Sequence, residues 1–472
     1  MQRWHLTLGL ATTAVAAAVV VPNLKGTSDA PPVVEPPITT VHPVPTPPVD
    51  VVPPDTDGRL SLSASLDQTA LLSGSGEDRF LVLEVSADAV EGATRRPVHL
   101  SVVMDTSGSM AARGKMTHAR AAAQELVGLL GPEDTFSLIT FDDRAEVRIP
   151  SRTVTDPSTL KRRIGQIHTG GGTNLFDGLS SGLSEVRTDP REGVRRVVVL
   201  SDGKANIGIT DAQSLRREAG ANVNEGVTVS AIGLGVDYNE DLLAAMADAG
   251  GGSYRFVDSP GTLTSMFTEE LQQLSTVVAR QTALSLDLAD GVQVREIYGY
   301  DVERSKDGYS VFLGDLYAGQ TKKVVARVHV PDGALGSVDV VDAVVTHVDA
   351  NTSQAHRATA HVDATVTKDT RVARASVVQD ARKQATKAQV GTLVQEAAQD
   401  YARGDIAGNQ ATYDKAWELV NEFNTDFEDD EMLQSLGYIA EQKQEFAKAR
   451  PASSAGKAQV KRAKEGARAY TH

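Results

Sequence analysis

Four short runs of valine, leucine and isoleucine, separated by helical patterns, constrain the fold of this sequence more than any other feature. The runs are Val98–Met104, Thr135–Phe141, Arg195–Leu200 and Val227–Leu234. Strands that are apolar at nearly every position are buried on both faces, which requires helices on both sides of a parallel sheet. Helical stretches such as Lys115–Leu130 and Leu175–Glu185 lie between the runs. Residues 97–275 are therefore predicted to form an α/β doubly wound domain.

The segments on either side of this domain alternate apolar and polar residues, as half-buried strands do. Residues 59–96 contain RLSLSASLDQTALL, and residues 280–368 contain TALSLDL and VDVVDAVVTHV. Insertion explains this order most simply, because the termini of a compact domain often lie close together. The predicted fold is a Rossmann-like α/β doubly wound domain inserted in a loop of one β-sandwich.

The C-terminal part of the chain changes to a helical pattern. Residues 369–449 include YARGDIAGNQATYDKAWELV, which predicts two helices around a Gly-Asp turn, an αα-hairpin. Residues 450–472 are small, polar and basic, and are expected to form a flexible tail.

The N-terminal residues resemble a targeting segment. Within residues 1–24, Arg3 precedes an apolar run that is shorter than the roughly 20 residues of a membrane-spanning helix. This predicts a signal peptide or, if it is not cleaved, an N-terminal membrane anchor. Residues 25–58 are rich in proline and predict an extended, semi-rigid linker. The chain is therefore expected to be exported to the periplasm or cell envelope, or secreted.

Composition excludes several classes of function. A net charge of −15 disfavours nucleic acid or an anionic membrane as the main partner. The chain has no cysteine, so disulfides, zinc–thiolate sites and thiol nucleophiles are excluded. It also has no nucleophile elbow, phosphate-binding loop or His-Glu-x-x-His motif, so we do not expect an enzyme.

Three polar segments carry the chemistry that the sequence predicts. Asp105–Ser109 (DTSGS) follows the first strand of the α/β domain, at the end of the strand where such folds bind ligands. Its carboxylate and hydroxyl oxygens suit hard cations such as Mg²⁺, Mn²⁺ or Ca²⁺. Two later loops, Gly170–Asn174 and Ser201–Gly203, supply a further hydroxyl and a second carboxylate.

In order and spacing these segments resemble the metal-ion-dependent adhesion site of the von Willebrand factor A (VWA) family, over roughly residues 97–274. The resemblance implies one divalent cation, Mg²⁺ or else Mn²⁺ or Ca²⁺. The implied ligands are Asp105, Ser107, Ser109, Thr173 and Asp202. Asp202 is expected to bind the cation either directly or through a water molecule. The rim expected to contact a partner consists of Gly108, Gly172, Asn174, Gly203 and Asp142.

The donor set predicts how such a site would work. Two carboxylates and neutral hydroxyls leave the cation electrophilic, with a position that an Asp or Glu carboxylate of a partner protein can fill. The resemblance thus implies a cation-dependent adhesion module. Residues 233–258 (GLGVDYNEDLLAAMADAGGGSYRFVD) are also similar to bacterial relatives of calcium-activated chloride-channel regulators and inter-alpha-trypsin-inhibitor heavy chains.

Two other functions stay open from sequence alone. VWA domains also occur in accessory subunits of ATPase or chelatase complexes, and a cytosolic location would favour that alternative. The protein could instead be an envelope scaffold in which the metal site is incidental. Loss of partner binding on replacement of Asp105 by Ala separates the adhesion module from the scaffold.

Overall fold

The computed structural model describes residues 59–89, 96–305 and 308–471. The predicted signal or anchor (1–24) and the predicted linker (25–58) lie outside these residues, so both stay predictions. In the described part of the chain, no helix is both long and apolar enough to span a membrane.

The α/β domain is built on a six-stranded sheet with the order β6-β5-β4-β7-β8-β9. Its strands are β4 (Val98–Asp105), β5 (Thr135–Phe141), β6 (Ala145–Thr153), β7 (Val194–Ser201), β8 (Val227–Leu234) and β9 (Gly251–Val257). The prediction of a parallel sheet needs correction, because β6 pairs antiparallel with β5. A short turn joins these two strands, and a parallel pair would need a long crossover connection.

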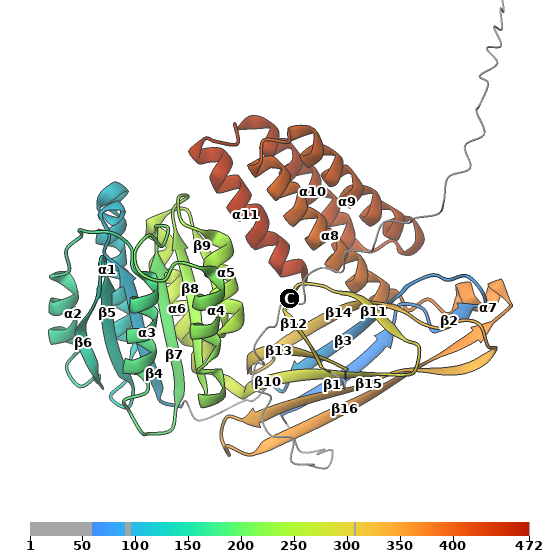
Figure 1. The fold of residues 1–472 in the computed structure, drawn as a ribbon, viewed down its shortest axis with the longest axis horizontal. Helices are drawn as coiled ribbons and strands as arrows, with labels where there is room; N and C mark the ends of the chain where they lie inside the picture. Colours follow the sequence, from blue (N-terminus) through green and yellow to red (C-terminus); the bar gives the residue numbers. More distant parts are fainter. Residues whose placement is uncertain (1–58, 90–95, 306–307, 472) are drawn as a thin grey trace, which may run out of the picture. The chain divides into compact units, whose positions relative to one another are not determined.

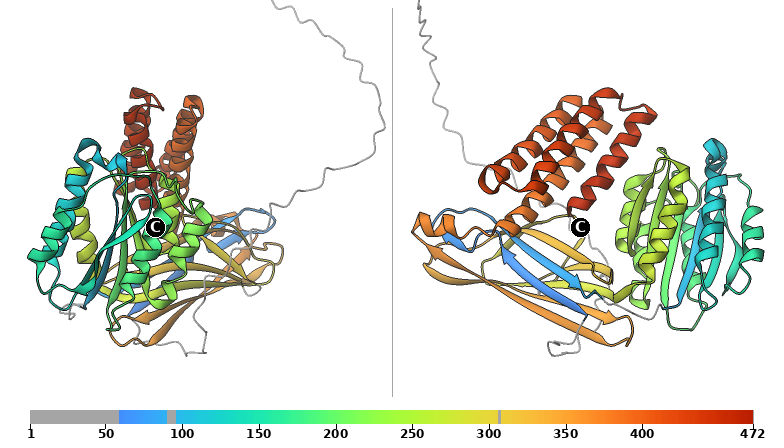
Figure 2. Two further views of the ribbon diagram at one scale, coloured as in Figure 1. Left: turned by 60° about the vertical axis from the view of Figure 1, so that its left-hand side comes forward. Right: turned by 180° about the vertical axis from the view of Figure 1, so that it is seen from behind.

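Helices cover both faces of this sheet (Figures 1 and 2). One face carries α1 (Lys115–Leu129), α2 (Pro157–Gly165) and α6 (Leu263–Leu274), and the other carries α3 (Leu175–Val186), α4 (Ala212–Gly220) and α5 (Glu240–Ala249). Neighbouring residues of β4 point to opposite sides, so Val102 packs in the core with α1 and Val103 in the core with α3. Burial on both sides explains why the sequence of β4 is apolar at almost every position.

Strands from before and after the α/β domain share two further sheets, ordered β1-β3-β14-β11 and β12-β13-β10-β15-β16-β2. Their bounds are β1 (Leu60–Leu66), β2 (Ala70–Leu72), β3 (Arg79–Ala87), β10 (Val277–Leu288), β11 (Gln293–Ile297), β12 (Val302–Ser305), β13 (Gly308–Tyr317), β14 (Thr321–His329), β15 (Gly336–Asp349) and β16 (Ala355–Thr367). Leu83 of β3 and Val345 of β15 lie in one apolar core between the sheets. The α/β domain therefore occupies the chain between two strands, β3 and β10, of a single two-sheet region.

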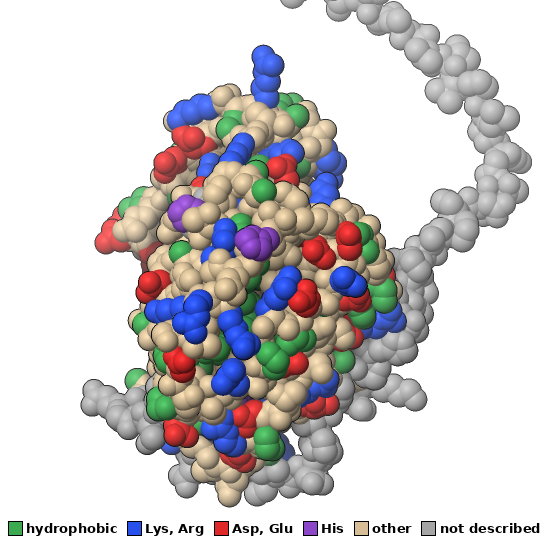
Figure 3. Space-filling model, turned by 90° about the vertical axis from the view of Figure 1, so that its left-hand side faces the viewer, with side chains coloured by type: hydrophobic (Ala, Val, Ile, Leu, Met, Phe, Trp, Pro, Cys, Tyr) green, Lys and Arg blue, Asp and Glu red, His purple; other side chains and the backbone are tan. Residues whose placement is uncertain are grey.

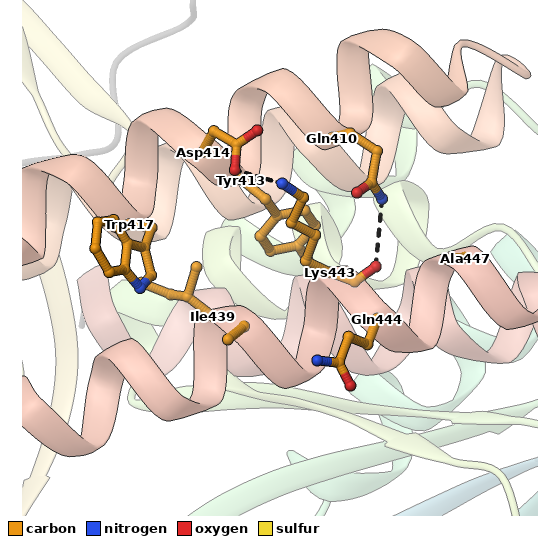
Figure 4. Close-up of a pocket in the computed structure, with 9 residues that line it drawn as sticks. Gln410, Tyr413, Asp414, Trp417, Ile439, Lys443, Gln444 and Ala447 are labelled. Carbon is orange, nitrogen blue, oxygen red and sulfur yellow. Dashed lines mark hydrogen bonds and ion pairs between the residues drawn. The ribbon is translucent and has the colours of Figure 1, made fainter. Parts of the chain in front are cut away.

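The C-terminal region is helical, with α7 (Thr370–Ala375), α8 (Gln379–Ala402), α9 (Ile406–Phe427), α10 (Asp430–Lys448) and α11 (Ser454–Thr471). The predicted Gly-Asp turn joins α8 to α9. Gly404 adopts a φ of +87°, and Asp405 caps α9 by accepting a hydrogen bond of 2.8 Å from the Gly408 amide. Figure 4 shows a groove between α9 and α10, lined by Trp417 and crossed by an ion pair between Lys443 and Asp414.

The prediction of a flexible tail at residues 450–472 is wrong for most of the segment, because Ser454–Thr471 forms α11. Val460, Ala463 and Ala467 lie in the same apolar core as residues of α8. Outside this core, Lys464 pairs with Asp241 of the α/β domain at 2.7 Å. The small and basic composition is thus that of a helix that packs closely on one side and forms ion pairs on another.

The crossing of α8 and α11 supplies a test of this packing. A methyl group on Gly391 would lie 2.7 Å from Thr471 Cγ2 and 2.9 Å from the Ala467 carbonyl oxygen, whereas one on Gly437 of α10 meets nothing within 4 Å. We expect Gly391→Ala to lower the free energy of unfolding by about 1–3 kcal/mol through overpacking. Gly437→Ala should raise it by about 0.5–1 kcal/mol through helix propensity. Urea unfolding followed by circular dichroism measures both values, and equal gains for the two variants would contradict this crossing.

Candidate metal centre

Asp105 is the last residue of β4, and the chain turns sharply after it. The Ser107 amide donates a hydrogen bond of 2.8 Å to Asp105 Oδ1, which closes a turn on the motif's own carboxylate. The segment that follows, η1 (Gly108–Gly114), has a helical turn and then a kink at Ala112 and the left-handed residue Arg113 (φ 53°). The motif therefore sits on a compact loop at the carboxyl end of a central strand, where α/β folds bind ligands.

Backbone hydrogen bonds tie the three predicted loops together. The Gly170 amide donates to the Thr106 carbonyl oxygen at 2.7 Å, which joins the glycine loop to the first motif. The Asn206 amide donates to the Thr173 carbonyl oxygen at 3.1 Å, which joins the glycine loop to the segment after β7. The three loops are therefore held as one unit.

Three of the predicted ligand side chains, those of Ser107, Ser109 and Asp202, form a connected set. Ser107 Oγ lies 2.9 Å from Ser109 Oγ, and Ser109 Oγ donates to Asp202 Oδ1 at 2.7 Å. Asp105 Oδ2 accepts a hydrogen bond of 2.6 Å from Ser201 Oγ. Oxygen atoms from the first and third loops are thus within direct contact of one another.

The space over Gly203 shows where all three loops converge. A methyl group on Gly203 would lie 3.2 Å from Thr173 Oγ1, 3.6 Å from Ser109 Oγ and 3.7 Å from Asp105 Oδ2. Two hydroxyl oxygens and one carboxylate oxygen therefore lie close to the space that a side chain at position 203 would occupy. These are hard ligands of the kind that Mg²⁺, Mn²⁺ and Ca²⁺ take, so the residues present fit the implied cation.

The fit depends on hydroxyls more than on carboxylates. Among the described residues there is no group of three or more His, Cys, Asp or Glu side chains placed to hold a metal ion. The candidate centre has two carboxylates, those of Asp105 and Asp202, and hydroxyls supply its other predicted donors. Two carboxylates balance the charge of a divalent cation only formally, because neutral hydroxyls supply most of its predicted ligands.

Most of the centre is buried. Asp105 and Asp202 are 0% and 1% exposed, whereas Ser109 is exposed, so the site opens to solvent at Ser109. Burial raises the pKa of Asp105 to about 6, although hydrogen bonds from Ser107 and Ser201 act in the opposite direction. Desolvation disfavours the charged carboxylate, and a bound cation would relieve that cost.

The raised pKa predicts how the stability of the metal-free protein depends on pH. A carboxyl whose pKa is higher in the folded state stabilises the fold below the unfolded pKa, and this stabilisation is lost as pH rises through the folded pKa. Between pH 4 and about pH 6, wild type should lose about 2–3 kcal/mol relative to Asp105→Asn. Urea unfolding in metal-free buffer across this range measures the difference, and parallel profiles for the two proteins would contradict it.

Three residues at the centre were not predicted as parts of it. Lys115 Nζ donates to Asp202 Oδ2 at 2.5 Å, Ser201 binds Asp105, and Asn206 Oδ1 accepts from the Thr173 amide at 2.9 Å. The Ser201 contact could have been proposed from its place in Ser-Asp-Gly. The direction of the Lys115 side chain depends on packing that sequence does not show.

Four of the predicted rim residues are exposed or half-buried, and the fifth, Asn174, is buried. The Gly108 amide donates to the Gly171 carbonyl oxygen, and the Gly172 amide donates to Asp143 Oδ1. Asp142 and Gly203 are half-buried beside these loops. Asn174, expected on the rim, is instead 5% exposed and caps α3, because its side chain accepts from the Asp177 amide and donates to Asp177 Oδ2.

The face of the protein in Figure 3 carries lysine and arginine side chains interspersed with aspartate and glutamate. It therefore presents no continuous surface of one charge in this view. On this face, no broad surface of one charge marks a ligand site.

The fold and the site together define an α/β domain of the VWA type. Residues 100–204 match the family described as von Willebrand factor type A domain, so the chain contains a VWA domain. It is 30% identical over 232 residues to an uncharacterized protein of Synechocystis sp., covering 49% of this chain and 54% of that protein. It is 29% identical over 204 residues to human inter-alpha-trypsin inhibitor heavy chain H4, covering 40% of this chain and 22% of that protein. The chain thus spans about half or less of these relatives.

Solved structures extend the similarity of fold beyond the VWA domain. A von Willebrand factor type A protein from Catenulispora acidiphila superposes with a TM-score of 0.68 at 18% identity, covering 86% of this chain and 97% of that one. The ArnB paralog VWA2 from Sulfolobus acidocaldarius gives 0.58 at 17% identity, covering 88% and 100%. At these identities the likeness concerns the fold alone.

Proposed function

We propose that this protein is an exported binding module that holds a partner protein through a divalent cation. Asp105, Ser107, Ser109, Thr173 and Asp202 would hold the ion, Mg²⁺ or else Mn²⁺ or Ca²⁺. The observation that carries the proposal is the convergence of Asp105, Ser109 and Thr173 oxygens over Gly203.

The partner's contribution follows from charge. With neutral hydroxyls as most of its ligands, the cation keeps an attraction for a further anionic oxygen. Ser109 lies on the exposed side of the otherwise buried centre, so a ligand can approach there. An Asp or Glu carboxylate of a partner protein supplies a charge-assisted contact of the required kind.

Export is the second part of the proposal, and it is supported by sequence alone. An apolar N-terminal segment followed by a proline-rich linker would direct the chain out of the cytosol and keep the VWA domain at a distance from the membrane. A retained N-terminal segment would act as a tether, and a cleaved one would release the protein into the periplasm or medium.

Affinity capture tests the proposed function. Tagged full-length protein is incubated with envelope extract in Mg²⁺ and, in parallel, with a chelator. We expect a partner that is retained in Mg²⁺, released by the chelator and absent with Asp105→Ala. The matched control is Asp290→Ala, an exposed acid in the two-sheet region, which should capture normally. Capture that survives both the chelator and Asp105→Ala, with the fold intact, would contradict the proposal.

A further inference from the structure

A lysine side chain reaches into the candidate metal centre. Lys115 is the first residue of α1, and its Nζ donates to Asp202 Oδ2 at 2.5 Å. The two side chains are 11% and 0% exposed. An ammonium group is thus buried against one of the two carboxylates of the centre.

The neighbouring backbone leaves room for this lysine. Gly235 follows β8 with a φ of +82°, and a methyl group there would lie 3.3 Å from Lys115 Cε and 3.4 Å from Lys115 Nζ. On the backbone side of the lysine, the left-handed Gly114 immediately precedes Lys115, where α1 begins. Two glycines in special conformations therefore border the lysine, one on the β8 side and one on the α1 side.

The lysine changes the charge that a cation meets. Ionised Asp105 and Asp202 carry two negative charges, and Lys115 cancels one of them. A divalent cation then leaves the centre with one net positive charge, which one external carboxylate neutralises. Without the lysine, the two carboxylates alone would balance the cation, and there would be less electrostatic demand for an external anion.

We propose that Lys115 couples the cation to the carboxylate of the partner: it weakens binding of the cation alone and makes cation and carboxylate bind cooperatively. This inference rests on the proposed function of the same site. Coupling between two ligands is reciprocal, so a carboxylate should raise cation affinity by the same factor as the cation raises carboxylate affinity. The chain would then retain its cation chiefly when a partner is bound.

Mn²⁺ titrations of the full-length protein test the coupling, with free Mn²⁺ measured by electron paramagnetic resonance. Each titration is run in sodium acetate, as the carboxylate probe, and in sodium chloride at equal ionic strength. Wild type should bind Mn²⁺ at least about threefold more tightly in acetate. Lys115→Met should bind Mn²⁺ about tenfold more tightly than wild type in chloride and gain little from acetate.

Two further variants make the result specific. Lys115→Gln removes the charge but keeps a hydrogen-bond donor for Asp202, and should behave as Lys115→Met does. Lys204→Met removes an exposed lysine beside Gly203 and should match wild type. A folded Lys115→Gln protein with unchanged or weaker Mn²⁺ affinity would overturn the role of Lys115. Equal Mn²⁺ binding by wild type and Asp105→Ala would instead overturn the proposed function.

Discussion

Replacing Asp105 by Ala is expected to lower the affinity of the protein for Mg²⁺ or Mn²⁺ at least about 100-fold. Asp105 carries the carboxylate of the centre that has no lysine partner, and its Oδ2 faces the space over Gly203. Without it, a cation would meet hydroxyls and an aspartate already paired with Lys115. Calorimetric titration of the full-length protein measures the loss.

The control for this variant is Asp290→Ala, which removes an exposed acid far along the chain and should bind the cation as wild type does. Circular dichroism establishes that Asp105→Ala is folded. Because burial raises the pKa of Asp105, its removal should not destabilise the metal-free protein at neutral pH. Undiminished uptake by the folded variant would place the cation elsewhere.

Replacing Arg196 by Met is expected to lower the free energy of unfolding by about 3–5 kcal/mol, because it leaves a buried carboxylate without its cation. Arg196 of β7 is 0% exposed. Its Nη1 donates to Glu270 Oε1 at 2.9 Å and to Ser230 Oγ at 2.7 Å, and its Nη2 donates to Tyr317 Oη at 3.3 Å. Chemical denaturation of the purified protein measures the change.

Two comparisons separate this network from a general effect of losing arginine. Arg195→Met removes the preceding, half-buried arginine, which donates to backbone carbonyls, and should cost at most about 1 kcal/mol. Arg196→Met combined with Glu270→Met should be less destabilised than Arg196→Met alone, since the Glu270 carboxylate is then removed with its cation. Asp315, whose Oδ2 lies 3.8 Å from Arg196 Nη2, loses this arginine in both variants, so the recovery should be partial. A loss below about 1 kcal/mol for Arg196→Met would mean that Glu270 finds another partner.

The α/β core could be predicted because its signal is carried by side chains that are buried on both faces of the sheet. The predicted bounds of Thr135–Phe141 and Val227–Leu234 coincide with β5 and β8. The edge strand β6 was missed, since its sequence, AEVRIPSRT, is largely exposed and carries charges. The antiparallel direction of β6 follows from a short turn and not from any apolar pattern.

Only the residues of the candidate site that lie in short, distinctive motifs could be predicted from the sequence. Asp105 and Thr173 come from segments whose order and spacing are distinctive. Lys115 could not be assigned, because a long side chain has many rotamers and the one observed depends on the space left by Gly235. The prediction of a flexible tail where α11 lies was wrong for a similar reason. Alanines that pack on α8 look no different in sequence from the alanines of a solvated segment.

An anomalous difference map from crystals soaked in Mn²⁺ tests the central claim most directly. We expect the strongest peak over Gly203, within about 2–2.5 Å of oxygen atoms from Asp105, Ser109 and Thr173, the range of bonds between hard cations and oxygen. A map with no peak there, or with its only strong peak at another group of carboxylates, would contradict the account.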